Sequence, residues 1–372
     1  MRTQLWDVFC RVIDNHGDLG VCWRLAADLA SRGDAVRLWV DEPGALAWMA
    51  PGGAPGVRVL PWRDPGPDEP PGDVVIEAFG CDPPAPFVQR MAQRIPAPGW
   101  INLEYLSAEG FVRRSHGLPS PQLSGPGAGL TKWFFYPGFT AGTGGLLREP
   151  GLLSRQAGFE PARLRHALGI EPDDGMRTAL LFCYDNPALP GWLETLAQQR
   201  APTRLWVMPG PAAQQVGRWL GADAQPGAQA TRGALGVRFL PFVSQPQFDE
   251  LLWAADLNVV RGEDSLVRAL WAGKPFIWHI YPQHDGAHGP KLAAFLDHYL
   301  AGAHPSLAAT IRQTHWHWNG LDGDRPRLQE NTWPSPTWQE HAQRQTQCWA
   351  HQPDLGSELR HFAAKLLQAR SG

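Results

Sequence analysis

The amino-acid sequence predicts an α/β protein built from two doubly wound, Rossmann-like domains. The chain has 372 residues, which is more than a single hydrophobic core usually serves. Its opening residues alternate as strand, glycine-containing loop, helix and strand, the pattern of a parallel βαβ unit. A second series of alternating strands and helices starts near Thr178. Two consecutive series of this kind predict two domains that face each other across a cleft.

The first series opens with an apolar-rich run that ends in the loop DNHGDLG. Apolar residues then recur at four-residue spacing, as at Val21, Leu25 and Leu29, and Gly33 predicts the end of that helix. A Gly-, Pro- and Ser-rich stretch at 110–145, which contains the aromatic sequence KWFFYPGF, predicts a long loop. Strands are expected at residues 6–14, 35–40, 73–80 and 100–106.

The second series predicts strands at residues 178–184, 204–208, 237–243, 257–260 and 275–280, and helices at 190–199, 248–255 and 265–272. The tail at 355–368 has the pattern of a helix that can pack back on the first half. The expected domains are an N-terminal one at 1–155 with the C-terminal helix at about 353–372, a linker at 156–176, and a C-terminal domain at 177–352.

Composition excludes several classes of protein. With 43% hydrophobic and 19% charged residues, the chain is globular rather than disordered. A net charge of -3 without a dense Lys/Arg run gives no reason to expect a nucleic-acid partner. The N-terminus lacks the order of a secretion signal, and no apolar stretch could span a bilayer, so we expect a cytoplasmic protein without a membrane partner. Five scattered cysteines without CxxC spacing predict buried free thiols.

The first candidate site is the acidic loop DNHGDLG at residues 14–20, at the carboxyl end of the first strand, where ligands gather in open α/β sheets. Gly17 and Gly20 let a substrate approach the backbone closely. The loop lacks GxGxxG, and its carboxylates at Asp14 and Asp18 would repel a pyrophosphate but suit a cationic acceptor. The alternative makes Asp14 a turn former and Asp18 a helix N-cap.

The second candidate site is the sequence RGEDS at residues 261–265, which follows a strand and opens a helix. A helix N-terminus binds phosphate through its free N–H groups, and Arg261 and Ser265 can add donors. Glu263 and Asp264 are poor neighbours for phosphate, so at least one is expected to face hydroxyl groups of a ribose or sugar. This pattern favours a nucleotide-diphosphate sugar; the alternative is an ordinary capped helix with acids in its first turn.

An aromatic and amide-rich group can supply the stacking surface and edge contacts that a nucleobase needs. Its members are Tyr184, Phe242, Gln245 and Phe248, although each Phe taken singly is more often a core residue. Tyr281 lies just past a strand end, with His288 and Lys291 downstream, and these residues are candidates for diphosphate contacts or, equally, for a solvated loop.

No metal site is predicted. The D-x-D at Asp322 and Asp324 lies in a turn sequence, and His315 and His317 alternate as a strand pair would, without the ligands that a zinc site needs. Walker and GxSxG motifs are absent.

The motifs also carry a family resemblance over nearly the whole chain. DVFCRVIDNHGDLGVCWRLAADL, PFVSQPQFDELLWAADLNVVRGEDS and RGEDSLVRALWAGKPFIWHIYPQ resemble, in order, segments of the protein-arginine rhamnosyltransferases that modify translation elongation factor P. The resemblance implies the GT-B fold, with the C-terminal helix packing back on the N-terminal domain. It implies dTDP-β-L-rhamnose as donor, inversion at the anomeric carbon, and one arginine in the N-terminal domain of elongation factor P as acceptor, a modification that helps rescue ribosomes stalled on proline runs.

By the same resemblance, Asp14 and Asp18 are the catalytic acids, with Asp18 as general base, and Glu263 is the donor-site acid. The donor contacts implied are Gly17, Tyr184, Phe242, Gln245, Phe248, Arg261, Glu263, Asp264, Ser265 and Tyr281. His16, where Tyr or Phe is commoner, and Ser244, in place of Pro, depart from the family pattern.

We therefore expect two carboxylates to hold and deprotonate a guanidinium, while the helix at Asp264 and Arg261 stabilise the leaving dTDP without a metal or cofactor. Two alternatives stay open. One is a GT-B transferase that uses another nucleotide sugar on a different acceptor, and the other is a non-catalytic nucleotide-sugar-binding protein.

Overall fold

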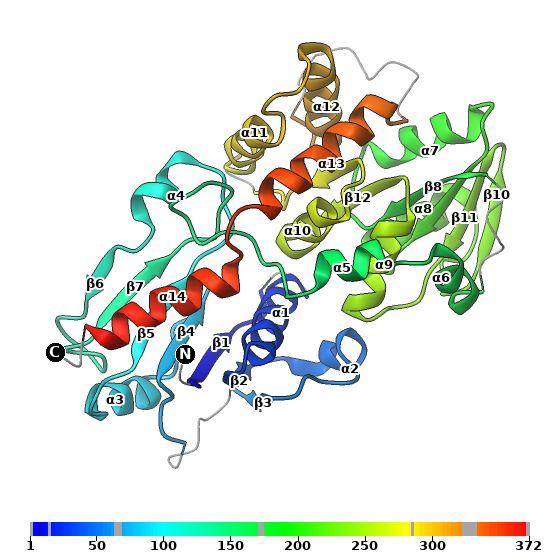
Figure 1. Ribbon diagram of the computed structural model, residues 1–372. Helices are drawn as coiled ribbons and strands as arrows, with labels where there is room; N and C mark the ends of the chain where they lie inside the picture. The colour runs from blue at the N-terminus through cyan, green and yellow to red at the C-terminus, as the bar shows by residue number, and fades with distance from the viewer. Residues whose placement is uncertain are drawn as a thin grey trace. The chain divides into compact units, whose positions relative to one another are not determined.

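The computed structural model describes residues 3–13, 16–62, 69–169, 175–283, 286–321 and 333–369. The chain divides into two compact units, residues 1–152 with 351–372, and residues 153–350 (Figure 1). The C-terminal segment thus returns to the first unit. Within the described residues, no helix has both the length and the apolar character needed to cross a bilayer.

The first unit contains a seven-stranded sheet in the order β3-β2-β1-β4-β5-β7-β6. All its pairs are parallel except β6 with β7. Its strands are β1 (Leu5–Cys10), β2 (Ala35–Val40), β3 (Val57–Pro61), β4 (Val74–Ala78), β5 (Gly99–Leu103), β6 (Pro119–Pro121) and β7 (Thr131–Phe135). Its helices are α1 (Gly17–Ser31), the 3-10 turn η1 (Pro43–Ala45), α2 (Leu46–Met49), α3 (Ala85–Gln93), α4 (Gly110–Ser115) and α14 (Leu355–Gln368).

Helices cover both faces of this sheet, as in a doubly wound domain (Figure 1). Trp6, Val8 and Cys10 alternate toward one face, where they share a buried cluster with apolar residues of α1 and α14. Phe9 points to the opposite face and packs with Phe87 of α3 at a ring separation of 4.9 Å. The two-residue period of β1 therefore builds a core on each side of the sheet.

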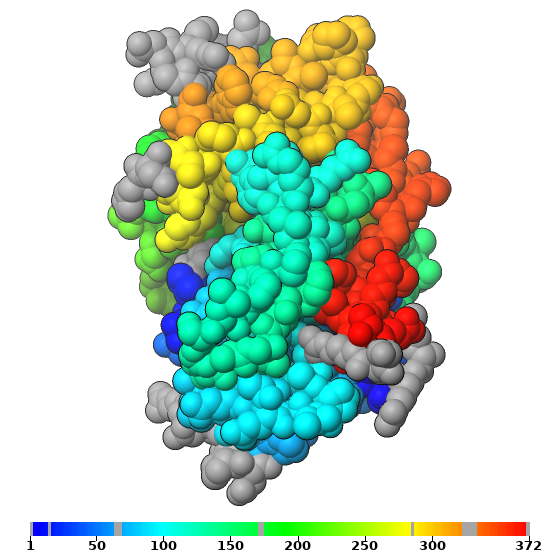
Figure 2. Space-filling model, turned by 90° about the vertical axis from the view of Figure 1, so that its left-hand side faces the viewer, coloured from blue at the N-terminus to red at the C-terminus, as the bar shows by residue number. Residues whose placement is uncertain are grey.

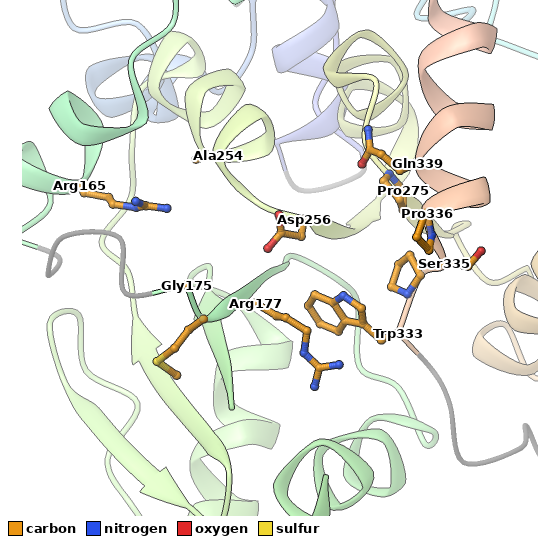
Figure 3. Close-up of a pocket in the computed structure, with 12 residues that line it drawn as sticks. Arg165, Gly175, Arg177, Ala254, Asp256, Pro275, Trp333, Ser335, Pro336 and Gln339 are labelled. Atoms are coloured by element: carbon orange, nitrogen blue, oxygen red, sulfur yellow. The ribbon is translucent and has the colours of Figure 1, made fainter. Parts of the chain in front are cut away.

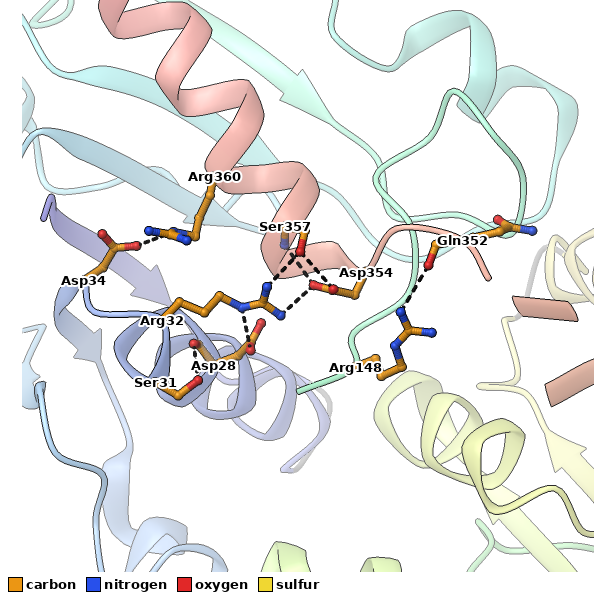
Figure 4. Close-up of polar contacts among 9 residues, drawn as sticks. All are labelled: Asp28, Ser31, Arg32, Asp34, Arg148, Gln352, Asp354, Ser357 and Arg360. Carbon is orange, nitrogen blue, oxygen red and sulfur yellow. Dashed lines mark hydrogen bonds and ion pairs between the residues drawn. The ribbon is translucent and has the colours of Figure 1, made fainter. Parts of the chain in front are cut away.

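The helix α14 is held against α1 by polar contacts as well as by its apolar face (Figure 4). Arg32, just after the end of α1, donates to Asp28, to Ser357 and to Asp354 at 2.9, 2.8 and 2.7 Å. The side chain of Asp354 also caps α14 by accepting from the Ser357 N–H at 2.8 Å. Arg360 pairs with Asp34 at 2.7 Å. In Figure 2, the red C-terminal segment lies directly beside the cyan-to-green part of the same unit.

The second unit contains a six-stranded sheet in the order β10-β11-β9-β8-β12-β13, parallel except for β10 with β11. Its strands are β8 (Arg177–Leu181), β9 (Thr203–Val207), β10 (Gln229–Arg232), β11 (Leu235–Phe239), β12 (Leu257–Arg261) and β13 (Phe276–His279). Its helices are α5 (Leu152–Ala157, which begins at the boundary), α6 (Pro161–Ala167), α7 (Leu189–Gln198), α8 (Pro211–Leu220), α9 (Gln245–Ala254), α10 (Gly262–Ala272), α11 (His288–Tyr299), α12 (Pro305–Trp318) and α13 (Pro336–Ala350).

The two sheets share a strand order that reverses beside the first strand of each unit. The reversal lies between β1 and β4 in the first sheet and between β8 and β12 in the second. At such a switch point the loops after neighbouring strands diverge and leave room for a ligand at the carboxyl edge. Both Rossmann-like domains expected from the sequence are present.

Several expectations from the sequence are wrong in detail. The stretch 110–145 is not one long loop, because it contains α4, β6 and β7, and β7 pairs in parallel with β5. His315 and His317 lie on α12 rather than on a strand. Cys348, on α13, is exposed, whereas the other four free cysteines are buried as expected. In contrast, the helical segment expected at PARLRHALGI, within the stretch 156–176 assigned to the linker, is present as α6, which packs against α9.

Candidate active site

The loop after β1 is held by carboxylates that accept its backbone N–H groups. Asp41 accepts from the Val12 N–H at 3.0 Å, and Asp18 accepts from the Ile13 N–H at 2.9 Å through Oδ2. The loop is therefore anchored at the carboxyl edge of β1, beside the switch point. Asp14, the second predicted catalytic acid, lies outside the described residues.

Asp18 is not the N-cap of α1, which corrects one interpretation of the sequence. The helix begins at Gly17, its cap residue is His16 without a side-chain cap bond, and Asp18 is the second helical residue. Its side chain turns back toward the Ile13 N–H instead, and the residue is only 4% exposed. A carboxylate in the first turn is stabilised by the positive end of the helix.

A tyrosine two residues past the end of β5 approaches the other oxygen of Asp18. The Tyr105 hydroxyl lies 3.4 Å from Asp18 Oδ1 and donates to it. The Tyr105 ring stacks on Phe79, with centroids 4.2 Å apart and planes 11° from parallel. Phe79 follows β4 and has a φ of 59°, a conformation that non-glycine residues adopt at a cost. The loop after β1 thus supplies a backbone N–H to this buried carboxylate, and the segments after β4 and β5 supply a stacked pair of aromatic side chains beside it.

In the second unit, β12 leads into α10 through Gly262, whose φ of 65° turns the chain tightly. The Trp278 indole N–H donates to the Gly262 carbonyl at 2.8 Å, so the turn is tied to β13. Arg268 of α10 forms a bidentate, buried pair with Asp249 of α9 at 2.8 and 2.7 Å. These bonds fix the N-terminus of α10 relative to α9 and β13.

Arg261 is the residue around which the donor-site side chains gather. Its guanidinium carbon lies 4.6 Å from the ring centroid of Phe182 and 4.8 Å from that of Tyr184. Tyr184 makes an edge contact with Tyr281 at 5.4 Å, and Phe182 makes one with Phe248 at 5.5 Å. A cation held among aromatic faces suits an anionic ligand that carries a flat base.

The other predicted donor residues lie at the same edge of the sheet. Glu263 and Asp264 occupy the first turn of α10 and are half-buried, and Ser265 behind them is buried. Gln245 is the buried first residue of α9, while Phe242 is 52% exposed in the loop before that helix.

The two residues that depart from the family pattern, Ser244 and His16, each make a defined local contact. Ser244, found where Pro is expected, caps α9 in a reciprocal capping box with Gln247. His16, at the start of α1, makes an edge contact with Trp48 at a ring separation of 5.4 Å. Gly17 is the first residue of the same helix.

Sequence reasoning missed two residues at this site, Phe182 and His279. Phe182 was part of a predicted buried strand, but β8 ends one residue earlier, so this ring lies at the edge under Arg261. His279 ends β13 and makes an edge contact with Tyr184 at 5.3 Å. Burial, together with the charges of Arg261 and His288, lowers the pKa of His279 to about 4, so its imidazole is neutral at neutral pH. The one signal that the sequence offers for these residues is their position: Phe182 lies one residue past the end of a strand, and His279 is the last residue of one.

A separate cavity of about 440 Å³ lies at the opposite edge of the second sheet (Figure 3). Its lining includes the first residue of β8, Arg177, whose guanidinium carbon lies 4.5 Å from the ring centroid of Trp333. Asp256 and Pro275, just before β12 and β13, also line it. None of the predicted site residues does, so this cavity is distinct from the donor site.

In the parts of the chain that the structure describes, no three His, Cys, Asp or Glu side chains are grouped so that they could hold a metal ion. The D-x-D at Asp322 and Asp324 lies outside those parts.

Comparison with known proteins identifies the family of this chain. A family model described as elongation-factor P (EF-P) rhamnosyltransferase EarP matches residues 6–364. Protein-arginine rhamnosyltransferases of Pseudomonas putida and Pseudomonas aeruginosa are 47% and 45% identical to this chain. They cover 96% and 97% of it, and 98% and 99% of their own lengths.

A solved structure, described as the structural basis for EarP-mediated arginine glycosylation of translation elongation factor EF-P, is 35% identical. It covers 98% of this chain and 99% of its own, with a TM-score of 0.69. The expected GT-B fold is thereby confirmed. The acidic loop, the Arg261 site and these matches lead to one conclusion: the chain belongs to the EarP family of elongation factor P rhamnosyltransferases, and it is a glycosyltransferase.

Proposed function

We propose that this enzyme transfers L-rhamnose from dTDP-β-L-rhamnose to one arginine in the N-terminal domain of translation elongation factor P, with inversion at the anomeric carbon. The modified factor would then rescue ribosomes stalled on proline runs. The names of the curated relatives and of the similar solved structure support arginine as the acceptor group. The observation that carries the proposal is the division of charge. Carboxylate lies at the acceptor edge of one unit and Arg261 at the donor edge of the other.

On the acceptor side, Asp18 is the proposed general base. A guanidinium has a pKa above about 12 and delocalised lone pairs, so it attacks only if its proton leaves as the C–N bond forms. Asp18 is fixed by the Ile13 N–H at one oxygen, and Tyr105 approaches the other. We assign Asp14 to the same task, since two carboxylates can hold the N–H fork of one arginine and localise electron density on one nitrogen.

On the donor side, the nucleotide takes up negative charge as it leaves. Arg261 and the N-terminus of α10, with Ser265, would stabilise that charge. Phe182, Tyr184 and Phe248 supply aromatic surface for the base, and Glu263 is proposed to bind hydroxyl groups of the ribose or rhamnose. A single displacement by the arginine nitrogen, with no enzyme nucleophile between, inverts the anomeric carbon.

The test is a transfer assay read by mass spectrometry. The enzyme is incubated with dTDP-rhamnose and elongation factor P, and one deoxyhexose is expected on a single arginine. Asp18→Asn should bind dTDP as well as the unchanged enzyme does but lose transfer by about 10²- to 10⁴-fold, the usual worth of general-base assistance.

Asp297→Asn is the matched control, because it makes the same chemical change at an exposed residue of α11. It should leave transfer unchanged. Near-normal transfer by Asp18→Asn would refute the base assignment, and no mass gain at saturating donor would refute the proposed function. Titration with dTDP, UDP and GDP then tests the choice of nucleotide.

A further inference from the structure

His279 occupies a position from which it can share a ligand with Arg261. The two residues end neighbouring parallel strands and pair directly in register, Arg261 of β12 with His279 of β13. His279 is 6% exposed, and its ring meets the edge of Tyr184, the same ring over which Arg261 lies. It therefore belongs to the carboxyl edge where the donor-site residues gather.

The backbone on both sides of His279 is fixed by one side chain. Asn319, at the end of α12, donates to the Trp278 carbonyl at 2.8 Å and accepts from the Ile280 N–H at 3.0 Å. The Trp278 indole in turn donates to Gly262, at the start of α10. The imidazole is thus held in a preformed place rather than on a loose loop.

Two buried nitrogen atoms in this place have no hydrogen-bond partner among the described residues. They are Nδ1 of His279 and one terminal guanidinium nitrogen, Nη1, of Arg261. A buried polar atom without a hydrogen-bond partner costs free energy. Two such nitrogen atoms on paired residues at the carboxyl edge of the sheet indicate a ligand that forms hydrogen bonds with both. The ligand atom must accept hydrogen bonds, because guanidinium N–H groups only donate.

A second buried histidine shows that burial alone does not explain this arrangement. His315 on α12 is fully buried, and one of its nitrogens, Nε2, also has no partner among the described residues. However, its Nδ1 lies 2.9 Å from the Ile311 carbonyl of its own helix, and its ring packs against Phe276 in the core. The cation whose charge acts on His315 is Arg312 of the same helix, α12, and not a residue of the donor-site edge, so His315 serves as the matched control.

We propose that His279 is a donor-binding residue whose Nδ1–H donates to a diphosphate oxygen of the nucleotide sugar, beside Arg261. The inference rests on the proposed function, because it takes a nucleoside diphosphate as the ligand of this edge. A neutral imidazole is suited to the role, since it gives a directional donor without adding a second charge next to the guanidinium.

Three variants separate this role from packing. His279→Leu removes both nitrogens. His279→Asn keeps an N–H donor near the place of Nδ1, whereas His279→Gln moves the donor toward the place of Nε2. We expect His279→Leu to weaken dTDP binding about 10- to 100-fold, the usual worth of a hydrogen bond to a charged group. His279→Asn should stay within about threefold of the unchanged enzyme, and His279→Gln should resemble the Leu variant.

The affinities are measured by calorimetry for dTDP and by ligand-observed NMR for thymidine, which lacks phosphate. The His279→Leu loss should be confined to dTDP, and His315→Leu should lower the melting temperature without changing dTDP affinity. Equal weakening of dTDP and thymidine, or unchanged dTDP binding by a folded His279→Leu enzyme, would overturn the assignment of His279 alone. Failure of the unchanged enzyme to bind dTDP would instead overturn the proposed function, and this assignment with it.

Discussion

The side chain of Asp18, in the first turn of α1, is positioned by contacts with the loops that follow two strands, β1 and β5. Its one oxygen is held by the backbone after β1, and its other oxygen faces the hydroxyl of Tyr105 after β5. Phe79, after β4, stacks on the tyrosine ring. Tyr105 acts through Asp18 in this arrangement, and we regard it as a positioning residue.

Tyr105→Phe tests that role, because it removes the hydroxyl and keeps the ring that stacks on Phe79. The bond is long at 3.4 Å, so we expect a modest loss of about 3- to 10-fold in kcat, with no change in KM for the donor. Steady-state transfer assays measure both constants. Tyr105→Ala should lose more, because the stack disappears as well. An unchanged kcat in Tyr105→Phe would show that the hydroxyl does not position the base.

At the residue scale, the sequence predicts contiguous motifs better than assembled ones. RGEDS and DNHGDLG could be found because each holds several polar residues between a strand and a helix. Phe182 and His279 were missed because each is a single residue at the end of an apolar strand, and that position alone does not single out one residue as a ligand contact. Only the pairing of β12 with β8 and β13 brings them to Arg261.

At the scale of elements, periodicity decided what could be predicted. The helix expected at 355–368 is present with those bounds, because its apolar positions recur without interruption. β7 was missed because four of its five residues are half-buried beside the edge strand β6, which leaves no alternation to detect. His315 and His317 suggested a strand by their spacing alone, whereas the helix α12 runs through both.

The contact between α1 and α14 contains an unusual carboxylate (Figure 4). Burial raises the pKa of Asp28 to about 7, and Asp354 and Glu149 add to the effect, although Arg32 opposes it. One oxygen of Asp28 accepts from Arg32, and the other, Oδ2, has no hydrogen-bond partner among the described residues. That oxygen lies close to Gly356, where any Cβ would overlap with it.

This carboxylate predicts a pH dependence of folding stability. Its pKa is raised in the folded chain, so the folded state holds a proton that the unfolded state releases between about pH 4 and pH 7. The free energy of unfolding should therefore fall as the pH rises across that window, by roughly 2–4 kcal/mol, and level off above it.

Urea unfolding at several pH values measures the slope. Asp28→Asn, which cannot ionise, should flatten it and should be at least as stable as the unchanged protein at pH 8. The conservative control is Asp297→Asn, which should leave the slope as it was. A slope that survives Asp28→Asn would assign the effect to other groups.

At the scale of the whole molecule, the proposed site residues divide between the two units, and each unit has its own hydrophobic core. Except for Gly17, the proposed donor-site residues lie in residues 153–350, whereas the acidic loop and α14 lie in the first unit. Leu355, Leu359 and Leu366 of α14 are buried in the core of that first unit. Each large apolar side chain buried in this way stabilises by about 1.5–3 kcal/mol.

Deletion of residues 351–372 should therefore unfold the first unit and leave the second one folded. We expect dTDP binding to persist in calorimetry, transfer to be lost, and one of two thermal transitions to disappear. A matched variant, Leu366→Ala, should retain both transitions with the first shifted to lower temperature. Normal transfer by the deleted chain would show that α14 is dispensable.

The return of α14 to the first unit also sets an order of events on the ribosome. Residues 3–152 emerge first, but the helix that completes their core is translated after the whole of residues 153–350. The later-made unit can thus finish folding before the earlier one. Until then, the slot for α14 exposes apolar residues of α1 and β5, a surface that chaperones recognise. The first unit becomes complete only when its last helix leaves the exit tunnel.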